Sequence, residues 1–290
     1  MKIVIIGAGG RLGAALMSEY REKHDVIGFN RAQLDLSNFD GVRDELRSTN
    51  FAVLVNAAAL TNVDLCETER DRASLINGEA PGVLAKVCRD KGAKMIHFST
   101  DYVFDGEKRA PYIEEDEANP ISVYGESKLA GEKNVLAAEG PHLVVRASWV
   151  FGPDRPSFID GIIKRAKEDE EVDAIADKFS TPTYTLDIAK MLPHFFSGNV
   201  EGGILHFANA GECNWQQYAQ WALDCCHEAG LPLKARTVGA LKLKDMSNWV
   251  ARRPVYSVLS AAKYTELTGP PPRTWRDAVA DYITRFYSKK

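Results

Sequence analysis

The first strand of this chain and the glycine turn that follows it decide its fold class. Residues 2–16 read KIVIIGAGGRLGAAL, in which the apolar run KIVII leads into glycines and then into a segment of helical character. Four more short apolar runs follow, and they are DVIGF (25–29), FAVLVN (51–56), AKMIHFS (93–99) and HLVVRAS (142–148). Segments with helical spacing lie between them at 11–23, 38–48, 70–91 and 123–139. Strands and helices that alternate in this way predict an α/β fold with a doubly wound parallel sheet.

The composition excludes several classes of protein. The 290 residues carry 36 Lys and Arg against 40 Asp and Glu, so no excess of basic residues is available for nucleic acid. No apolar run approaches the roughly 20 residues that cross a bilayer, so we expect neither a membrane partner nor a signal peptide. The six histidines are scattered, and the five cysteines include no C-x-x-C pair. We therefore expect no metal site built by the protein, reduced thiols and a cytoplasmic location.

The glycines of the first turn have an unusual spacing for a nucleotide-binding motif. Counting Gly-x-Gly-x-x-Gly from Gly7 places Leu12 where the last glycine would stand, whereas Gly7, Gly10 and Gly13 are three residues apart. Glycines between a strand and a helix let a pyrophosphate approach the backbone at the helix N-terminus. We interpret the turn as a dinucleotide site, and the alternative is a tight turn without a ligand.

Two later stretches support a dinucleotide. NAAALT, which begins at Asn56 after the third strand, offers small side chains against which a flat ring can lie. Asp35, in AQLDLSN after the second strand, is placed to accept a hydrogen bond from an adenine amine, although it could simply begin a helix.

The end of the second strand predicts the choice of cofactor. Enzymes that prefer NAD place an acidic residue there, whereas a ribose 2′-phosphate is bound by a cation. This chain has Asn30 at that position and Arg31 directly after it, and Arg11 in the glycine turn is expected to approach the same phosphate. The sequence favours NADPH over NADH, unless both arginines are only solvated.

The regular alternation of strand and helix patterns ends near residues 151–158, FGPDRPSF, and the chain after them is more polar. We therefore predict a Rossmann-type dinucleotide-binding domain over 1–155 and a smaller C-terminal substrate-binding lobe over 156–290. GGILHFANAG resembles one more strand, so residues 181–210 are expected to return to the main sheet.

The middle of the chain holds the candidate catalytic groups. STDYVFDG follows the fourth strand, so Ser99 and Thr100 are expected at the carboxyl edge of the sheet, where such proteins bind ligands. Tyr124 and Lys128 are four residues apart, which places both on one face of a helix. A phenol transfers a proton readily at neutral pH only if a nearby cation lowers its pKa, and Lys128 can supply that charge. The alternative is an exposed tyrosine and lysine without a catalytic role.

These motifs together resemble the extended short-chain dehydrogenase/reductase family. The resemblance lies in GAGGRLG, in NAAA from Asn56, in STDYVFDG and in Tyr124-x-x-x-Lys128, and it extends through RASWVFG and RRPVYSVLS over residues 1 to about 285. It implies a Rossmann-type fold and an NADPH- or NADH-dependent oxidoreductase. Within the family, the motifs are similar to those of reductases of nucleotide-linked 4-keto-6-deoxysugars. The implied reaction converts dTDP-4-dehydro-L-rhamnose to dTDP-L-rhamnose for cell-surface polysaccharide.

The resemblance also implies a role for each motif residue. Tyr124 would donate a proton to the substrate carbonyl, Lys128 would hold the nicotinamide ribose and tune Tyr124, and Thr100 would hydrogen-bond the carbonyl oxygen. The residues implied to bind the substrate are Thr100, Asp101, Tyr102, Val103 and Trp149. The residues implied to bind the cofactor are Gly7, Gly9, Gly10, Arg11, Leu12, Gly13, Asn30, Arg31, Asp35, Leu36, Asn56, Ala57, Ala58, Ala59, Ser99, Tyr124 and Lys128.

Other interpretations stay open. One is a sister enzyme: a sugar-nucleotide epimerase or dehydratase, or a reductase of another keto sugar. Dehydratases of this superfamily carry Asp-Glu after the strand-end threonine, whereas this chain carries Asp101-Tyr102. Another is a non-catalytic dinucleotide-binding subunit, like the regulatory subunit of methionine adenosyltransferase. The resemblance further suggests a homodimer through helices 70–91 and 123–139, and Mg²⁺ at a dimer contact to which no residue is assigned.

Overall fold

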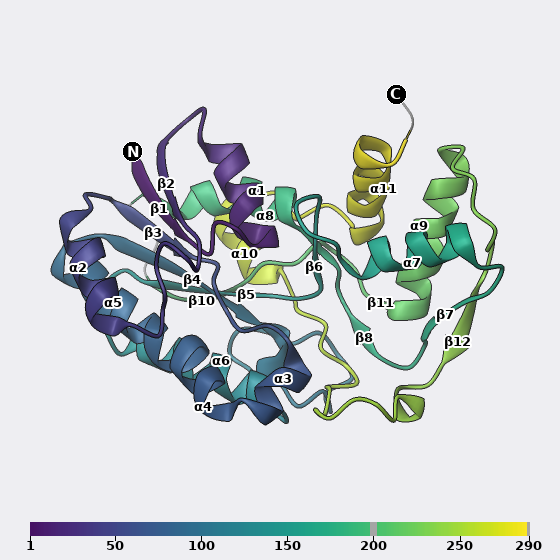
Figure 1. Cartoon of the computed structure of the whole chain (residues 1–290), viewed down its shortest axis with the longest axis horizontal. Helices are drawn as coiled ribbons and strands as arrows, with labels where there is room; N and C mark the ends of the chain where they lie inside the picture. Colours follow the sequence, from purple (N-terminus) through teal and green to yellow (C-terminus); the bar gives the residue numbers. More distant parts are fainter. Residues whose placement is uncertain (198–201, 289–290) are drawn as a thin grey trace.

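A six-stranded parallel sheet lies at the centre of the part of the chain that the structure, a computed structural model, describes: residues 1–197 and 202–288 (Figure 1). Its strand order is β10-β5-β4-β3-β1-β2. The strands are β1 (Lys2–Ile6), β2 (Asp25–Phe29), β3 (Val53–Asn56), β4 (Lys94–Thr100), β5 (Leu143–Ala147) and β10 (Gly203–His206). The five predicted strands and the α/β fold class are confirmed. Four of the apolar runs form inner strands and DVIGF forms the edge strand β2, and helices exclude water from both faces of the sheet.

Two layers of helices cover this sheet (Figure 1). Buried side chains of α1, α8 and α10 form a core on one face, and those of α2, α5 and α6 form a core on the other. These helices are α1 (Arg11–Tyr20), α8 (Thr185–Met191), α10 (Ala262–Thr268), α2 (Phe39–Ser48), α5 (Ala80–Asp90) and α6 (Val123–Leu136). The predicted helices at 11–23 and 123–139 are confirmed as α1 and α6, and each ends three residues before its predicted end.

The predicted helix over 70–91 is interrupted. It consists of α4 (Arg70–Ala73), a π-helical turn over Ser74–Glu79, and α5. Within the π-turn, the buried Asn77 donates to the Leu60 carbonyl at 3.0 Å and accepts from the Leu60 N–H at 2.8 Å. The break in the helix thus fixes the loop after β3, which borders the site described below.

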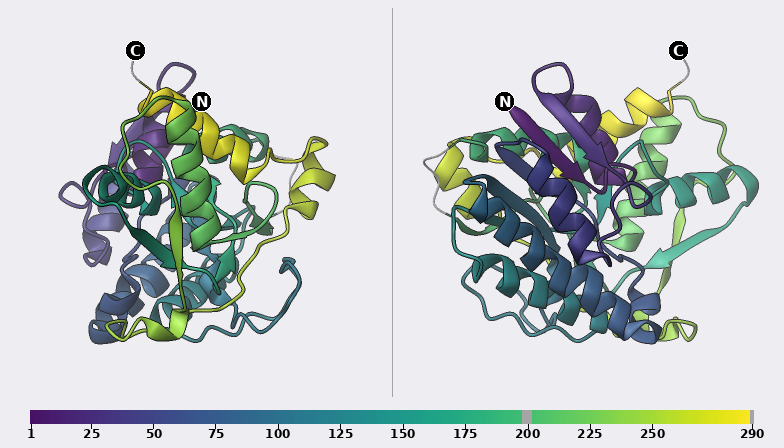
Figure 2. Two further views of the ribbon diagram at one scale, coloured as in Figure 1. Left: turned by 90° about the vertical axis from the view of Figure 1, so that its right-hand side faces the viewer. Right: turned by 60° about the vertical axis from the view of Figure 1, so that its left-hand side comes forward.

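Much of the C-terminal part of the chain forms a smaller group of helices and short strands beside the main sheet (Figure 2). Its elements are β6 (Val150–Phe151), α7 (Phe158–Glu168), β7 (Val172–Ile175), β8 (Phe179–Ser180), β9 (Thr183–Tyr184), β11 (Cys213–Asn214), α9 (Trp215–Glu228), β12 (Val238–Leu241) and α11 (Trp275–Phe286). A core shared by α7, α9 and α11 holds it together.

The chain crosses back to the main sheet within this C-terminal part. Strand β10 pairs with β5 in parallel, α8 packs on α1, and α10 packs on β10. The predicted division into 1–155 and 156–290, with 181–210 at the sheet, stays a prediction, and residues 198–201 and 289–290 of those ranges lie outside the described residues.

Candidate active site

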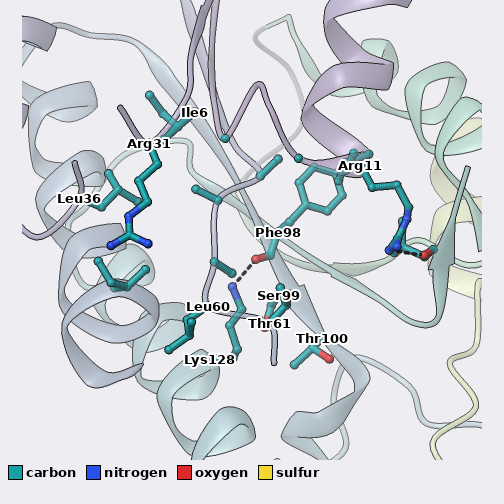
Figure 3. Close-up of a pocket in the computed structure, with 18 of the residues that line it drawn as sticks. Ile6, Arg11, Arg31, Leu36, Leu60, Thr61, Phe98, Ser99, Thr100 and Lys128 are labelled. Atoms are coloured by element: carbon teal, nitrogen blue, oxygen red, sulfur yellow. Dashed lines mark hydrogen bonds between the residues drawn. The ribbon is translucent and has the colours of Figure 1, made fainter. Parts of the chain in front are cut away.

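A cavity of ≈ 790 Å³ opens along the carboxyl ends of the central strands (Figure 3). Its wall includes the residues at or after these strand ends: Ile6, Asn30, Ala57, Thr100 and Ala147. Parallel strands bring their carboxyl ends to one edge of a sheet, so segments distant in sequence share this cavity.

The glycine turn borders the cavity at the start of α1. Gly7 has a φ of +84°, and a Cβ atom there would lie 2.8 Å from the backbone nitrogen of Ala58. The N-cap residue Gly10 supplies no side-chain hydrogen bond, which leaves the first N–H groups of α1 available to an anion. Gly9, Gly10 and Leu12 line the cavity as predicted for cofactor contacts.

Gly13 serves a different purpose from the one predicted. It does not line the cavity, and a Cβ atom on it would lie 2.1 Å from the carbonyl oxygen of Gly7. Its missing side chain therefore lets α1 pack against the turn that borders the cavity.

Arg31 is placed at the edge of the cavity as the sequence predicted. Its guanidinium projects over the cavity beside Leu36, which also lines it (Figure 3). The neighbouring Asn30 uses its side-chain oxygen to accept from the Ala32 N–H at 2.9 Å, so it caps its own turn. Arg72 of α4 also lines this end of the cavity, and the sequence analysis missed it because no motif surrounds it.

Asp35 lines the same end of the cavity, but its carboxylate is engaged within its own loop. It accepts hydrogen bonds from the Ser37 N–H at 3.0 Å and the Ser37 hydroxyl at 2.8 Å, and these bonds lower the pKa of its carboxyl. An adenine amine would therefore share this carboxylate with Ser37.

Arg11 lines the cavity, but the contacts of its guanidinium do not support an approach to the same phosphate as Arg31, which stays a prediction. The Arg11 guanidinium donates to the carbonyl oxygens of Val150 at 3.0 Å and Arg155 at 3.1 Å, and to that of Pro156. Figure 3 shows it on the opposite side of the cavity from Arg31. The carbonyls around β6 capture this side chain, and the guanidinium group of Arg155 in turn donates to the Gly9 carbonyl.

The alanines after β3 line the cavity, whereas Asn56 does not. Ala57, Ala58 and Ala59 present small side chains to it. Asn56 is fully buried, contacts His97 Nδ1 at 3.1 Å and accepts from the Ala58 N–H at 3.1 Å. The prediction that Asn56 contacts the cofactor is therefore corrected, because its amide holds the loop that carries the alanines.

Thr100, Tyr124 and Lys128 reach the cavity together. Thr100 ends β4, whereas Tyr124 and Lys128 lie in α6, and all three line the cavity. Ser99 and Phe98 lie beside them, and Lys128 Nζ donates to the Phe98 carbonyl at 2.7 Å (Figure 3). Helix α6 supports this cluster because its buried face packs on β4.

Burial governs the titration of this cluster. It raises the pKa of Tyr124, and a hydrogen bond with Thr100 opposes the rise. It also lowers the pKa of Lys128 to about 8, against the charge of Glu132. The predicted lowering of the Tyr124 pKa by Lys128 is not observed, because the loss of water around the phenol outweighs the other effects on it.

Aromatic side chains close the other end of the cavity. Asp101 and Tyr102, directly after β4, line it together with Trp149, whose φ of +40° is unusual for a bulky residue. The Trp149 ring stacks on Tyr218 with centroids 6.2 Å apart. Val103, predicted to bind the substrate, is fully buried in an apolar cluster and does not line the cavity, because the 3-10 turn after β4 directs it into the core.

Three further observations concern residues 1–197 and 202–288. No group of three or more His, Cys, Asp or Glu side chains there is arranged to hold a metal ion. None of the described helices is both long and apolar enough to span a bilayer. The five cysteines are buried and unpaired.

Comparison with known proteins identifies the family. The family model described as RmlD substrate binding domain matches residues 1–288. The chain belongs to this family. The RmlD family lies within the extended short-chain dehydrogenase/reductases, so the resemblance inferred from the sequence is confirmed.

Relatives of known name are similar to this RmlD-family chain over nearly its whole length. A dTDP-4-dehydrorhamnose reductase of Mycolicibacterium smegmatis is 39% identical over 97% of this chain and 85% of the relative. The spore coat polysaccharide biosynthesis protein SpsK of Bacillus subtilis is 34% identical over 97% of this chain and 96% of the relative. The crystal structure of Bacillus anthracis dTDP-4-dehydrorhamnose reductase in complex with NADP matches with a TM-score of 0.91 and 30% identity, covering 98% of this chain and 99% of that chain.

Proposed function

We propose that this protein is an oxidoreductase that reduces the 4-keto group of a nucleotide-linked 6-deoxysugar. The proposed reaction converts dTDP-4-dehydro-L-rhamnose to dTDP-L-rhamnose. NADPH is the preferred cofactor of the proposed enzyme, and NADH is an alternative. The observation that carries the proposal is the convergence of Thr100, Tyr124 and Lys128 on one cavity that also holds the glycine turn. The names of the M. smegmatis and B. anthracis relatives support the substrate.

The cavity suits a dinucleotide along its length. The N–H groups at the start of α1 would bind the pyrophosphate, and the alanines after β3 would border the adenine. Arg31 would bind the ribose 2′-phosphate, and Lys128 would hold the nicotinamide ribose. NADPH, when bound, supplies the hydride of the reaction.

The residues of this chain would handle the proton. Tyr124 holds a proton at its hydroxyl at neutral pH and would donate it to the substrate carbonyl oxygen. Burial raises its pKa, so it would release the proton only as hydride transfer makes that oxygen strongly basic. Thr100 lies within hydrogen-bond reach of Tyr124 and would orient the same oxygen. Trp149 and Tyr102 would cover the apolar side of the sugar ring.

A dehydratase is less compatible with this site. The residue after Asp101 is Tyr102, whose phenol is buried and whose pKa burial raises, so no second carboxylate stands beside the first. Net reduction should therefore consume one cofactor for each product.

The test is to incubate the purified protein with dTDP-glucose, the two upstream sugar-converting enzymes and NADPH, and to follow NADPH absorbance together with the sugar product. We expect one NADPH consumed per dTDP-L-rhamnose formed. Conversion of dTDP-glucose by this protein alone, with the upstream enzymes omitted and without loss of NADPH, would instead indicate an epimerase or dehydratase. NADPH binding without turnover would indicate a regulatory subunit.

Tyr124→Phe provides the matched variant for this test. Because only the phenol oxygen is removed, turnover should fall by roughly 100-fold or more while NADPH affinity changes by no more than a few-fold. Near-normal turnover by the variant would contradict the proton-donor role.

The remaining expectations are also proposals. We propose a cytoplasmic enzyme that forms a homodimer through the helical segments 70–91 and 123–139, with Mg²⁺ at a dimer contact to which no residue is assigned. Size-exclusion chromatography with and without Mg²⁺ tests the dimer and its dependence on the metal.

A further inference from the structure

Lys178 is a buried cation with no hydrogen-bond partner among the described residues. It precedes β8 and is fully buried, and its Nζ atom donates to no acceptor. The Nζ atom lies 5.1 Å from the centre of the Tyr102 ring and 5.5 Å from that of Trp149, and both rings line the catalytic cavity. The two rings provide only part of the stabilisation that a desolvated ammonium requires. A nearby anion must provide the rest.

Asp101, the residue that follows β4, is the buried carboxyl whose charge acts on Lys178, although no direct ion pair joins these two described side chains. Only 2% of its surface is exposed, and burial raises the pKa of its carboxyl while the charge of Lys178 opposes this rise. Burial lowers the pKa of Lys178 to about 8, and the charge of Asp101 opposes this fall while that of Arg253 adds to it. The titratable and charged groups around Asp101 are Lys178 and the phenols of Tyr102 and Tyr124, and the charge of Arg253 acts on both Lys178 and Tyr102.

Hydroxyl groups from three segments of the chain converge on Asp101. Its Oδ1 accepts from Thr100 Oγ1 at 3.1 Å, and its Oδ2 accepts from Ser180 Oγ at 3.1 Å and Ser257 Oγ at 2.5 Å. An ionised carboxylate accepts at every one of these positions, whereas a protonated one would carry a hydrogen toward one of them. The Ser180 hydroxyl also lies 3.1 Å from the Ser257 carbonyl oxygen and has one hydrogen to share between the two acceptors, so the constant donors to Asp101 are the hydroxyls of Thr100 and Ser257.

The direction of the Thr100 hydroxyl follows from the charge of Asp101. With its hydrogen directed at Asp101, Thr100 Oγ1 accepts from the Tyr102 N–H at 3.2 Å and turns its remaining lone pair toward Tyr124. Ser257 keeps the carboxylate paired when the Thr100 hydrogen turns to a substrate oxygen. A protonated Asp101 would reverse the direction of at least one of these hydrogen bonds.

We propose that Lys178 is a positioning residue whose charge keeps Asp101 ionised and thereby fixes the direction of the Thr100 hydroxyl beside Tyr124. This inference rests on the proposed reductase function. Lys178 does not line the cavity, so it acts on the reaction through Asp101 and not by contact with the substrate.

Lys178→Met tests the proposal by removing the charge while keeping a side chain of similar length. Without the cation, the pKa of the Asp101 carboxyl rises, so the acid limb of the kcat–pH profile should move to higher pH by about one pH unit or more. At a fixed pH on that limb, a displacement of about one pH unit lowers kcat by roughly tenfold, and raising the pH should restore it. A uniform loss of kcat at every pH would mean a merely structural role and would overturn the proposal.

A double-mutant cycle shows whether Lys178 acts through Asp101. In an Asp101→Asn background there is no carboxylate to titrate, so Lys178→Met should change kcat by less than about threefold and should leave the pH profile unmoved. Equal losses in the two backgrounds would overturn the proposal. Lys190→Met, on the exposed side of α8, is the matched control and should leave kcat and its pH profile unchanged.

The charge of Asp101 can also be measured without turnover. Infrared difference spectra of the Lys178→Met protein at pH 7 should contain a protonated-carboxyl C=O band that disappears when Asp101→Asn is added. Absence of this band in the folded variant overturns the proposal, whereas an inactive wild-type protein would overturn only the proposed function. Should Lys178→Met fail to fold, Lys178→Gln serves the same measurements, because it is neutral and retains a hydrogen-bond donor.

Discussion

The Asp64→Asn substitution tests how the segment 249–253 is held against α3 (Val63–Thr68) of the nucleotide-binding side. The carboxylate of Asp64 accepts from two guanidinium nitrogens of Arg253, at 2.7 and 3.1 Å. It also accepts from the backbone N–H groups of Val250 at 2.9 Å and Ala251 at 2.8 Å. One side chain thus connects parts of the chain that are 189 residues apart.

The magnitude follows from the titration of this carboxyl. Hydrogen bonds led by that of Arg253 lower the pKa of Asp64 to about 2, against about 3.9 in an unfolded chain. At ~1.4 kcal/mol per pKa unit, this difference corresponds to ~2.6 kcal/mol. Because 31% of the side chain is exposed, solvent screening reduces the contribution to ~1–2 kcal/mol. At pH 7 we expect Asp64→Asn to lower the melting temperature by about 2–5 °C.

The pH dependence gives this prediction a second check. The folded pKa lies below the unfolded one, so the stabilisation is complete above about pH 5 and is lost as the pH falls toward 2. The difference in melting temperature between the two proteins should therefore narrow as the pH is lowered from about 5 to 3. Asp25→Asn is the control, because Asp25 pairs with Lys2 while 65% exposed and should contribute under ~0.5 kcal/mol. Equal melting temperatures at pH 7, or a gap that does not narrow, would refute the reasoning.

Three further predictions concern the cofactor site and the core. Arg31→Ala should weaken NADPH binding by roughly 10- to 100-fold and leave NADH nearly unchanged, since a charge-assisted hydrogen bond contributes ~1.5–3 kcal/mol; equal losses in calorimetric titrations would contradict this. Gly13→Ala should weaken both cofactors and lower the melting temperature because its Cβ would overlap the turn, whereas Gly161→Ala, whose Cβ meets nothing within 4 Å, should not. Glu132→Gln should cost ~3–5 kcal/mol in urea unfolding because it leaves the buried Arg146 unpaired, and a loss below ~1 kcal/mol would contradict it.

Local sequence patterns predicted much of the fold and the composition of the cavity. The apolar runs could become strands of a parallel sheet only where both of its faces are covered, and the turn after β1 needed glycine for its close approach to the loop after β3. Thr100 reached the cavity because it ends a parallel strand, and Tyr124 and Lys128 reached it because a four-residue spacing places them on one helix face. Each of these results depends on spacing along the chain.

The sequence by itself therefore determined the parallel sheet, the glycine turn and the Tyr124–Lys128 pair, because strand alternation and helix periodicity act over a few residues. The tertiary structure alone decided where Arg11 points, how Tyr124 titrates and what surrounds Asp101. Carbonyls 139 to 145 residues away capture the Arg11 guanidinium, and burial by distant segments raises the pKa of Tyr124. The Asp101 carboxylate obtains its partners from residues 180 and 257, and its cation from residue 178. Long polar side chains and buried charges respond to whichever groups folding brings within a few ångströms, and the local sequence carries no record of those groups.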